Sequence, residues 1–134
     1  MTVSMNAWLQ GKIDDYKFQV RDATVDFYMA DAALNRPQAG VEQLTRYNRV
    51  SLEMANLCAM NGDEESYVHA LSKLHNRLIL EINNPEREYL FRVQCYTFAR
   101  HTLKLICQHY MLLGIWEKAS AFQSDFLKRV PNPL

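Results

Sequence analysis

The side chains best suited to chemistry in this 134-residue chain are four histidines and three cysteines. His69 and His75 stand six residues apart, and His101 and His109 stand eight apart. Helices that bind zinc usually present their ligands three or four residues apart, and neither pair does. The sequence also lacks an HExxH motif, a CxxC pair and a Glu-x-x-His motif. We therefore predict neither a metal site nor a cofactor.

Nucleophilic catalysis is not indicated either. Cys58, Cys95 and Cys107 each lie inside an apolar helical pattern, which is typical of a buried thiol rather than a reactive thiolate. Basic residues near Cys95 and Cys107 leave the reactivity of these two thiols open. The chain has no GxSxG elbow and no glycine-rich phosphate loop. We predict that it is not an enzyme.

The pattern of apolar residues predicts helices throughout. The longest stripe advances in steps of four and three residues and predicts one amphipathic helix over about residues 4–34. The same stripe is equally typical of a coiled-coil seam. Its members are Leu9, Ile13, Tyr16, Val20, Ala23, Phe27, Ala30 and Leu34.

Turn formers divide the rest of the chain into four more helices. Further stripes predict helices over about residues 41–60, 64–82, 85–113 and 116–129. Asp63 is the expected cap of the third helix, and Asn84 with Pro85 the expected start of the fourth. The fold class is therefore all-α. We predict a single domain, residues 1–134, built as an antiparallel bundle or as stacked hairpins over about 41–82 and 85–129.

Residues 105–131 resemble a tetratricopeptide-type helical hairpin. The resemblance rests on Tyr110 late in one helix, Gly114 at the turn, Ala119 in the next helix and Pro131 after it. It implies stacked hairpins with a concave surface that binds protein, as in small bacterial chaperones and adaptors. The two turn glycines, Gly62 and Gly114, stand 52 residues apart rather than the 34 of a tandem array.

The charge is balanced overall but not along the chain. Fifteen basic residues match fifteen acidic ones, so no bulk charge attracts the protein to nucleic acid or to an anionic membrane. Residues 1–83 carry a net charge of −3 and residues 84–134 a net charge of +3. The basic part would face an acidic partner or the acidic part of a second copy, unless the difference is ordinary scatter.

A nucleic-acid-binding regulator is the alternative function, because the helix over 85–113 mixes basic and aromatic residues. Aromatic rings can stack on bases while arginines contact phosphates. The residues concerned are Arg87, Arg92, Arg100, Lys104, Tyr89, Phe91, Tyr96 and Phe98.

Apolar residues outside the main stripes favour a protein-binding module instead. A helix that is apolar over most of its circumference is either central to a bundle or has a second face for a partner. We therefore predict a small chaperone, adaptor or regulatory partner that buries an apolar segment of another protein. The predicted contact residues are Phe18, Tyr28, Phe91, Arg92, Phe98, Arg100, Lys104 and Trp116.

The location and the oligomeric state are expectations of the same kind. The first helix is the expected interface of a homodimer. The N-terminus has no basic region followed by an apolar run, and no stretch is apolar enough to cross a membrane. Together with three unpaired cysteines, this predicts a cytoplasmic protein that does not bind a membrane.

Overall fold

The computed structural model describes residues 4–132 and residue 134, and it consists of five α-helices. They are α1 (Met5–Leu34), α2 (Val41–Met60), α3 (Glu64–Ile82), α4 (Tyr89–Leu112) and α5 (Trp116–Arg129). These residues include no β-strand, so the predicted all-α fold class is confirmed. Among the described residues, no helix has the length and apolar character that a membrane span requires.

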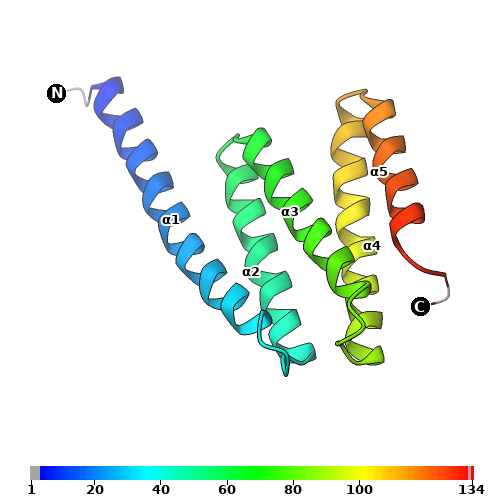
Figure 1. Ribbon diagram of the computed structural model, residues 1–134. Helices are drawn as coiled ribbons and strands as arrows, with labels where there is room; N and C mark the ends of the chain where they lie inside the picture. Colours follow the sequence, from blue (N-terminus) through cyan, green and yellow to red (C-terminus); the bar gives the residue numbers. More distant parts are fainter. Residues whose placement is uncertain (1–3, 133) are drawn as a thin grey trace.

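The helices form a row in chain order, each antiparallel to the one before it (Figure 1). Every helix packs against its neighbours in sequence, and α4 also reaches α2. The main core therefore lies between α2, α3 and α4, where Leu44, Leu74 and Leu78 are fully buried. The outer sides of α1 and α5 have no neighbouring helix (Figure 1).

Two turns of the same geometry join α2 to α3 and α4 to α5. Gly62 and Gly114 both have a φ of 74°, in the left-handed region that favours glycine. The amide of Asp63 donates to the carbonyl of Cys58 at 2.9 Å, and that of Ile115 donates to Tyr110 at 2.9 Å. Both glycines therefore end helices in the way that the sequence predicts.

The predicted cap of α3 is also confirmed. The Asp63 Oδ1 atom accepts a hydrogen bond from the amide of Ser66 at 3.2 Å. Hydrogen bonds from Ser66, with a further one from the hydroxyl of Tyr16, lower the pKa of Asp63. The carboxylate therefore stays charged at the positive end of the α3 dipole.

The predicted start of α4 at Pro85 is wrong, because the helix begins at Tyr89. Asn84 Oδ1 accepts from the amide of Glu86 at 3.0 Å, and the amide of Arg87 donates to the Asn84 carbonyl at 3.2 Å. These bonds form a tight turn in place of a helical one. The turn directs the side chain of Arg87 inward, where it pairs with Glu81.

The first helix is longer than its partner, which limits how much of it the chain can cover. At 1.5 Å per residue, α1 is about 45 Å long and α2 about 30 Å. Phe27, Ala30 and Leu34 are buried, whereas Leu9 and Ile13 of the same stripe are exposed. The N-terminal end of α1 leans away from the row (Figure 1). Packing within the chain therefore buries only the second half of the predicted stripe.

Candidate partner-binding surfaces

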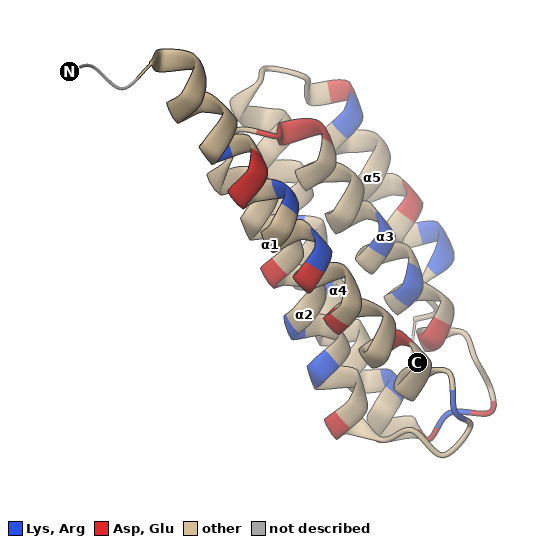
Figure 2. Cartoon of the chain, turned by 90° about the vertical axis from the view of Figure 1, so that its left-hand side faces the viewer, with Lys and Arg blue, Asp and Glu red and all other residues tan. Residues whose placement is uncertain are grey.

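The N-terminal part of α1 extends past the rest of the molecule. We call residues 5–15 the α1 arm; Figure 2 shows its first turns beyond the ends of the other helices. Trp8 is 54% exposed, Leu9 45% and Ile13 47%. Leu9 and Ile13 lie on the same apolar stripe that is buried in the C-terminal half of α1. The arm thus presents an apolar strip that is continuous with the core interface and has no cover within the described residues.

Tyr16 links α1 to the α2–α3 turn next to the arm. The hydroxyl of Tyr16 donates to Asp63 Oδ2 at 2.9 Å. Burial, together with hydrogen bonds to Cys58 and Asp63, raises the pKa of Tyr16, so this hydroxyl keeps its proton. Two cavities of about 420 and 200 Å³ lie beside α1 and share Met54 and Lys73 of the α2–α3 hairpin.

A second hollow surface lies at the opposite end of the row, between α4 and α5. Two cavities of about 580 and 480 Å³ share Phe126, and we call them together the α4–α5 groove. Residues of α4 from Tyr89 to Met111 form one wall, and α5 with the segment after it forms the other. Tyr89, Met111 and Leu127 are exposed on its edges. The groove is therefore long and apolar, with an open side.

The α4–α5 groove is lined by basic and neutral residues. Arg100, His101 and Lys104 line it, and neither cavity has an aspartate or glutamate in its wall. No ion pair in the described part of the chain involves Arg100 or Lys104. The guanidinium of Arg100 lies 5.9 Å from the ring centre of Tyr96. These cations are thus free to meet an anionic group from outside.

Several predicted contact residues are accessible, but they lie on different surfaces. Phe18 and Tyr28 are 65% and 62% exposed on α1, and Trp116 is 59% exposed at the start of α5. Arg100 and Lys104 line the α4–α5 groove. The structure therefore divides the predicted site between the two ends of the row.

The prediction that Phe91 contacts a partner is wrong. Its side chain is only 3% exposed and packs in the core, with the Arg87 guanidinium 4.8 Å from its ring centre. Phe98 is half-buried and packs against the same core. Arg92 is also half-buried, and its Nε donates to the carbonyl of Ile82 at 2.6 Å. These three residues hold α4 in place.

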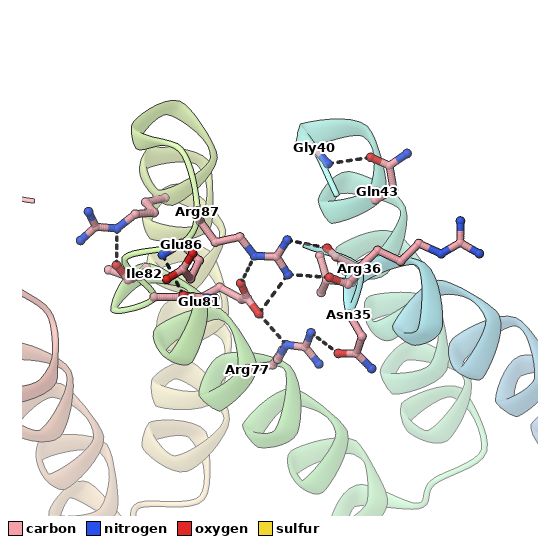
Figure 3. A network of polar contacts seen from close by, with 12 residues as sticks. Asn35, Arg36, Gly40, Gln43, Arg77, Glu81, Ile82, Glu86 and Arg87 are labelled. Carbon is pink, nitrogen blue, oxygen red and sulfur yellow. Dashed lines mark hydrogen bonds and ion pairs between the residues drawn. The ribbon is translucent and has the colours of Figure 1, made fainter. Parts of the chain in front are cut away.

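The polar cluster that the sequence did not reveal is a buried ion network where α1 and α3 end (Figure 3). The Glu81 carboxylate accepts from Arg87 Nε at 2.6 Å and from Arg77 Nε at 3.2 Å. Arg77 also pairs with Asp31 at 3.0 Å, and Arg87 donates to the carbonyl of Arg36 at 2.9 Å. Two guanidinium groups thus share the Glu81 carboxylate, and Arg87 also donates to backbone carbonyls at the end of α1, so the network stabilises the joint between α1 and α3. Only the position of Arg87 after a turn hints at it in sequence.

The groove-lining side of α4 does leave a trace in the sequence. Residues 97, 100, 104, 108 and 111 recur at steps of three and four beside the apolar stripe, with residue 101 next to 100. Because most of them are polar, they suggest a solvated surface. The sequence gives no reason to include His101 among the contact residues. The hollow itself depends on the position of α5, which local spacing does not define.

The cysteines and His75 are buried, and no metal-ligand cluster is found among the described residues. The described residues contain no group of three or more His, Cys, Asp or Glu placed to hold a metal ion. All three thiols are free and buried, and burial raises the pKa of Cys107 and raises that of Cys95 to about 12. His75 is fully buried, and burial lowers its pKa. Burial thus favours the neutral forms of Cys95, Cys107 and His75.

Comparison of the chain with family models, with curated proteins and with solved structures finds no match. The α1 arm and the α4–α5 groove are therefore the features that bear on function.

Proposed function

We propose that this chain is a non-enzymatic protein-binding module, a small chaperone, adaptor or regulatory partner that buries an apolar segment of another protein. One observation carries the proposal: the stripe that packs α1 onto α2 continues along the α1 arm, where Leu9 and Ile13 are exposed. A strip of this kind suits an apolar helix of another polypeptide, whose side chains would extend the existing interface. Each large side chain buried there contributes roughly 1.5–3 kcal/mol.

The tetratricopeptide-type resemblance belongs to this proposal. Tyr110 stacks on Phe122 with ring centres 5.9 Å apart, Ala119 is 3% exposed, and Gly114 has a positive φ. These features support a helical hairpin built in that manner over residues 105–131. Free, buried cysteines similarly favour a cytoplasmic location.

The alternative function, binding of nucleic acid through α4, has less support. Phe91 is buried and Phe98 half-buried, so neither ring is free to stack on a base. Tyr89 is the aromatic residue of α4 that is well exposed. The basic residues alone would give only contacts to phosphates.

Site-specific crosslinking tests the proposal at the arm. A photoreactive phenylalanine would replace Ile13 in one variant and Asp15 in the other, with the complete chain expressed in its native cells. Asp15 is also exposed but lies about 200° around the helix from Ile13. We expect position 13 to yield a defined protein adduct that position 15 does not.

The mass of that adduct distinguishes a different protein from a second copy joined through α1, the predicted homodimer. Light scattering of the purified chain provides an independent measure of self-association. Equal and diffuse labelling from both positions would contradict the proposal, because a specific interface on the apolar strip requires a difference between them.

A further inference from the structure

The α2–α3 and α4–α5 hairpins repeat each other with an offset of 52 residues. Gly62 and Gly114 have the same φ, and the hydrogen bonds across their turns link equivalent residues. Cys58 corresponds to Tyr110 in this register, and Asp63 corresponds to Ile115. Residues 41–78 of the first hairpin can therefore be matched with residues 93–130 of the second.

In the first hairpin, the groove between the two helices is filled by α4. This helix contacts both α2 and α3. Ile106 of α4 packs with Ala55 and Leu71 in one cluster, and the Thr102 hydroxyl lies 3.3 Å from Nδ1 of His75. The residues of the hairpin that α4 helps to bury include Leu44, Ala55, Leu71, Leu74 and Leu78.

The corresponding residues of the second hairpin line the α4–α5 groove. With the offset of 52, those five residues become Tyr96, Cys107, Gln123, Phe126 and Val130, and each lines one of the two cavities. No helix in the described part of the chain occupies this position. The groove is thus the place where one further helix would continue the row.

The charge of the groove specifies what that helix should carry. Arg100 and Lys104 correspond to Asn48 and Leu52 in the first hairpin, which are neutral; Asn48 is buried, and Leu52 packs against both core clusters that include residues of α4. Packing against a helix at these positions therefore requires no cation. The two basic side chains, with His101 beside them and no carboxylate in the wall, are complementary to acidic residues.

We infer that the α4–α5 groove binds an acidic amphipathic helix of a partner protein, whose apolar face covers Tyr96, Leu103 and the exposed Leu127 while its carboxylates pair with Arg100 and Lys104. The inference rests on the proposed function, a protein-binding module, but not on the α1 arm. A second copy is a poorer occupant: the half of α1 left free by packing, residues 5–22, carries three basic and three acidic residues.

Two stapled helical peptides provide the test. One has a leucine stripe flanked by glutamates, and the other has lysines in place of the glutamates. Binding to the full chain is measured by fluorescence anisotropy at low and at moderate salt. We expect the glutamate peptide to bind about tenfold more tightly than the lysine peptide, with the difference shrinking as salt screens the charges.

Matched variants locate that binding. The double variant Arg100→Glu/Lys104→Glu should reverse the preference between the peptides, and Leu127→Asp on the groove edge should weaken binding of the glutamate peptide. Ile13→Ser on the α1 arm should leave its affinity unchanged. All four side chains are exposed, and circular dichroism checks that each variant is folded.

Several results would overturn the inference, and the first three concern the peptides and nucleic acid. They are equal affinity for both peptides, an unchanged preference in the double variant, and tighter binding of an oligothymidylate that the double variant abolishes. Self-association lost in the same double variant would also overturn it, because the groove would then be an interface between copies. If Ile13→Ser alone abolishes peptide binding, the groove is not the binding site. The proposed function, which rests on the α1 arm, would then still hold.

Discussion

The guanidinium Nε of Arg87 lies 2.6 Å from Glu81 Oε2, and both side chains are buried where α3 ends. Arg87 also donates to the carbonyls of Leu34, the last residue of α1, and of Arg36 in the loop that follows it. One side chain thus provides hydrogen-bond donors to carbonyls at the end of α1 and neutralises a carboxylate on α3. The orientation of α1, and with it of the α1 arm, depends on this joint.

Removal of Arg87 should be strongly destabilising, because Glu81 would lose its closest cation in a buried position. We expect Arg87→Met to lower the free energy of unfolding by about 3–5 kcal/mol in urea titrations followed by circular dichroism. Arg129→Met is the control, since Arg129 pairs with Asp125 at the surface. Its loss should be about 0–1 kcal/mol. Similar losses in the two variants would contradict a structural role for the buried pair.

The turn glycines and the glycine of the α1 arm should respond to alanine in opposite ways. Gly62 has a positive φ, so Gly62→Ala should cost roughly 1–2 kcal/mol of unfolding free energy. Gly11 lies within α1, and a Cβ atom added there would have no neighbouring atom within 4 Å. Gly11→Ala should instead stabilise by roughly 0.5–1 kcal/mol, since alanine favours the helix. Thermal unfolding measures both, and a stabilised Gly62→Ala would refute the turn geometry.

Local patterns were sufficient to predict the helices but not what covers them. The ends of α2, α3 and α5 follow from glycine, aspartate and proline positions, because caps and turns are properties of a few adjacent residues. The start of α4 was missed because Arg87 turns inward to reach Glu81, and that contact depends on the packing of α3.

The candidate contact residues show the same limit. Phe18 and Phe91 both lie off the main stripe of their helix, yet one is exposed and the other buried. α1 has a neighbour on one side only, whereas α4 has neighbours on several sides. Periodicity gives the width of an apolar face, and the number of neighbouring helices determines how much of that face remains free.

Truncation of these two phenylalanines should therefore change the free energy of unfolding by very different amounts. Phe91→Ala removes a core side chain and should cost about 3–5 kcal/mol of unfolding free energy. Phe18→Ala removes an exposed ring and should change it by no more than about 0.5 kcal/mol. Urea unfolding of the two variants under identical conditions gives the comparison. A large loss for Phe18→Ala would mean that its ring is covered, for example by a second copy.

His75 should make the stability depend on pH, since it is buried and neutral in the folded chain. Burial lowers its pKa below the usual 6.5, and the charge of Arg129 acts in the same direction, whereas a backbone hydrogen bond at Ala99 and the charge of Asp125 oppose the shift. Its Nδ1 atom lies 3.3 Å from the hydroxyl of Thr102, and its Nε2 atom has no hydrogen-bond partner among the described residues. Burial is therefore the larger effect and disfavours a second proton on the ring.

The sign of the effect follows from proton uptake. Below pH 6.5 the unfolded chain protonates His75 more readily than the folded chain does, so stability falls as the pH falls. The loss approaches about 1.4 kcal/mol per pH unit until the pKa of the folded state is reached. Urea unfolding at several pH values should show this slope in the unmodified chain and a smaller one in His75→Gln. His69→Gln, at an exposed position, should keep the slope. Equal slopes in all three proteins would show that His75 gains its proton without opposing the fold.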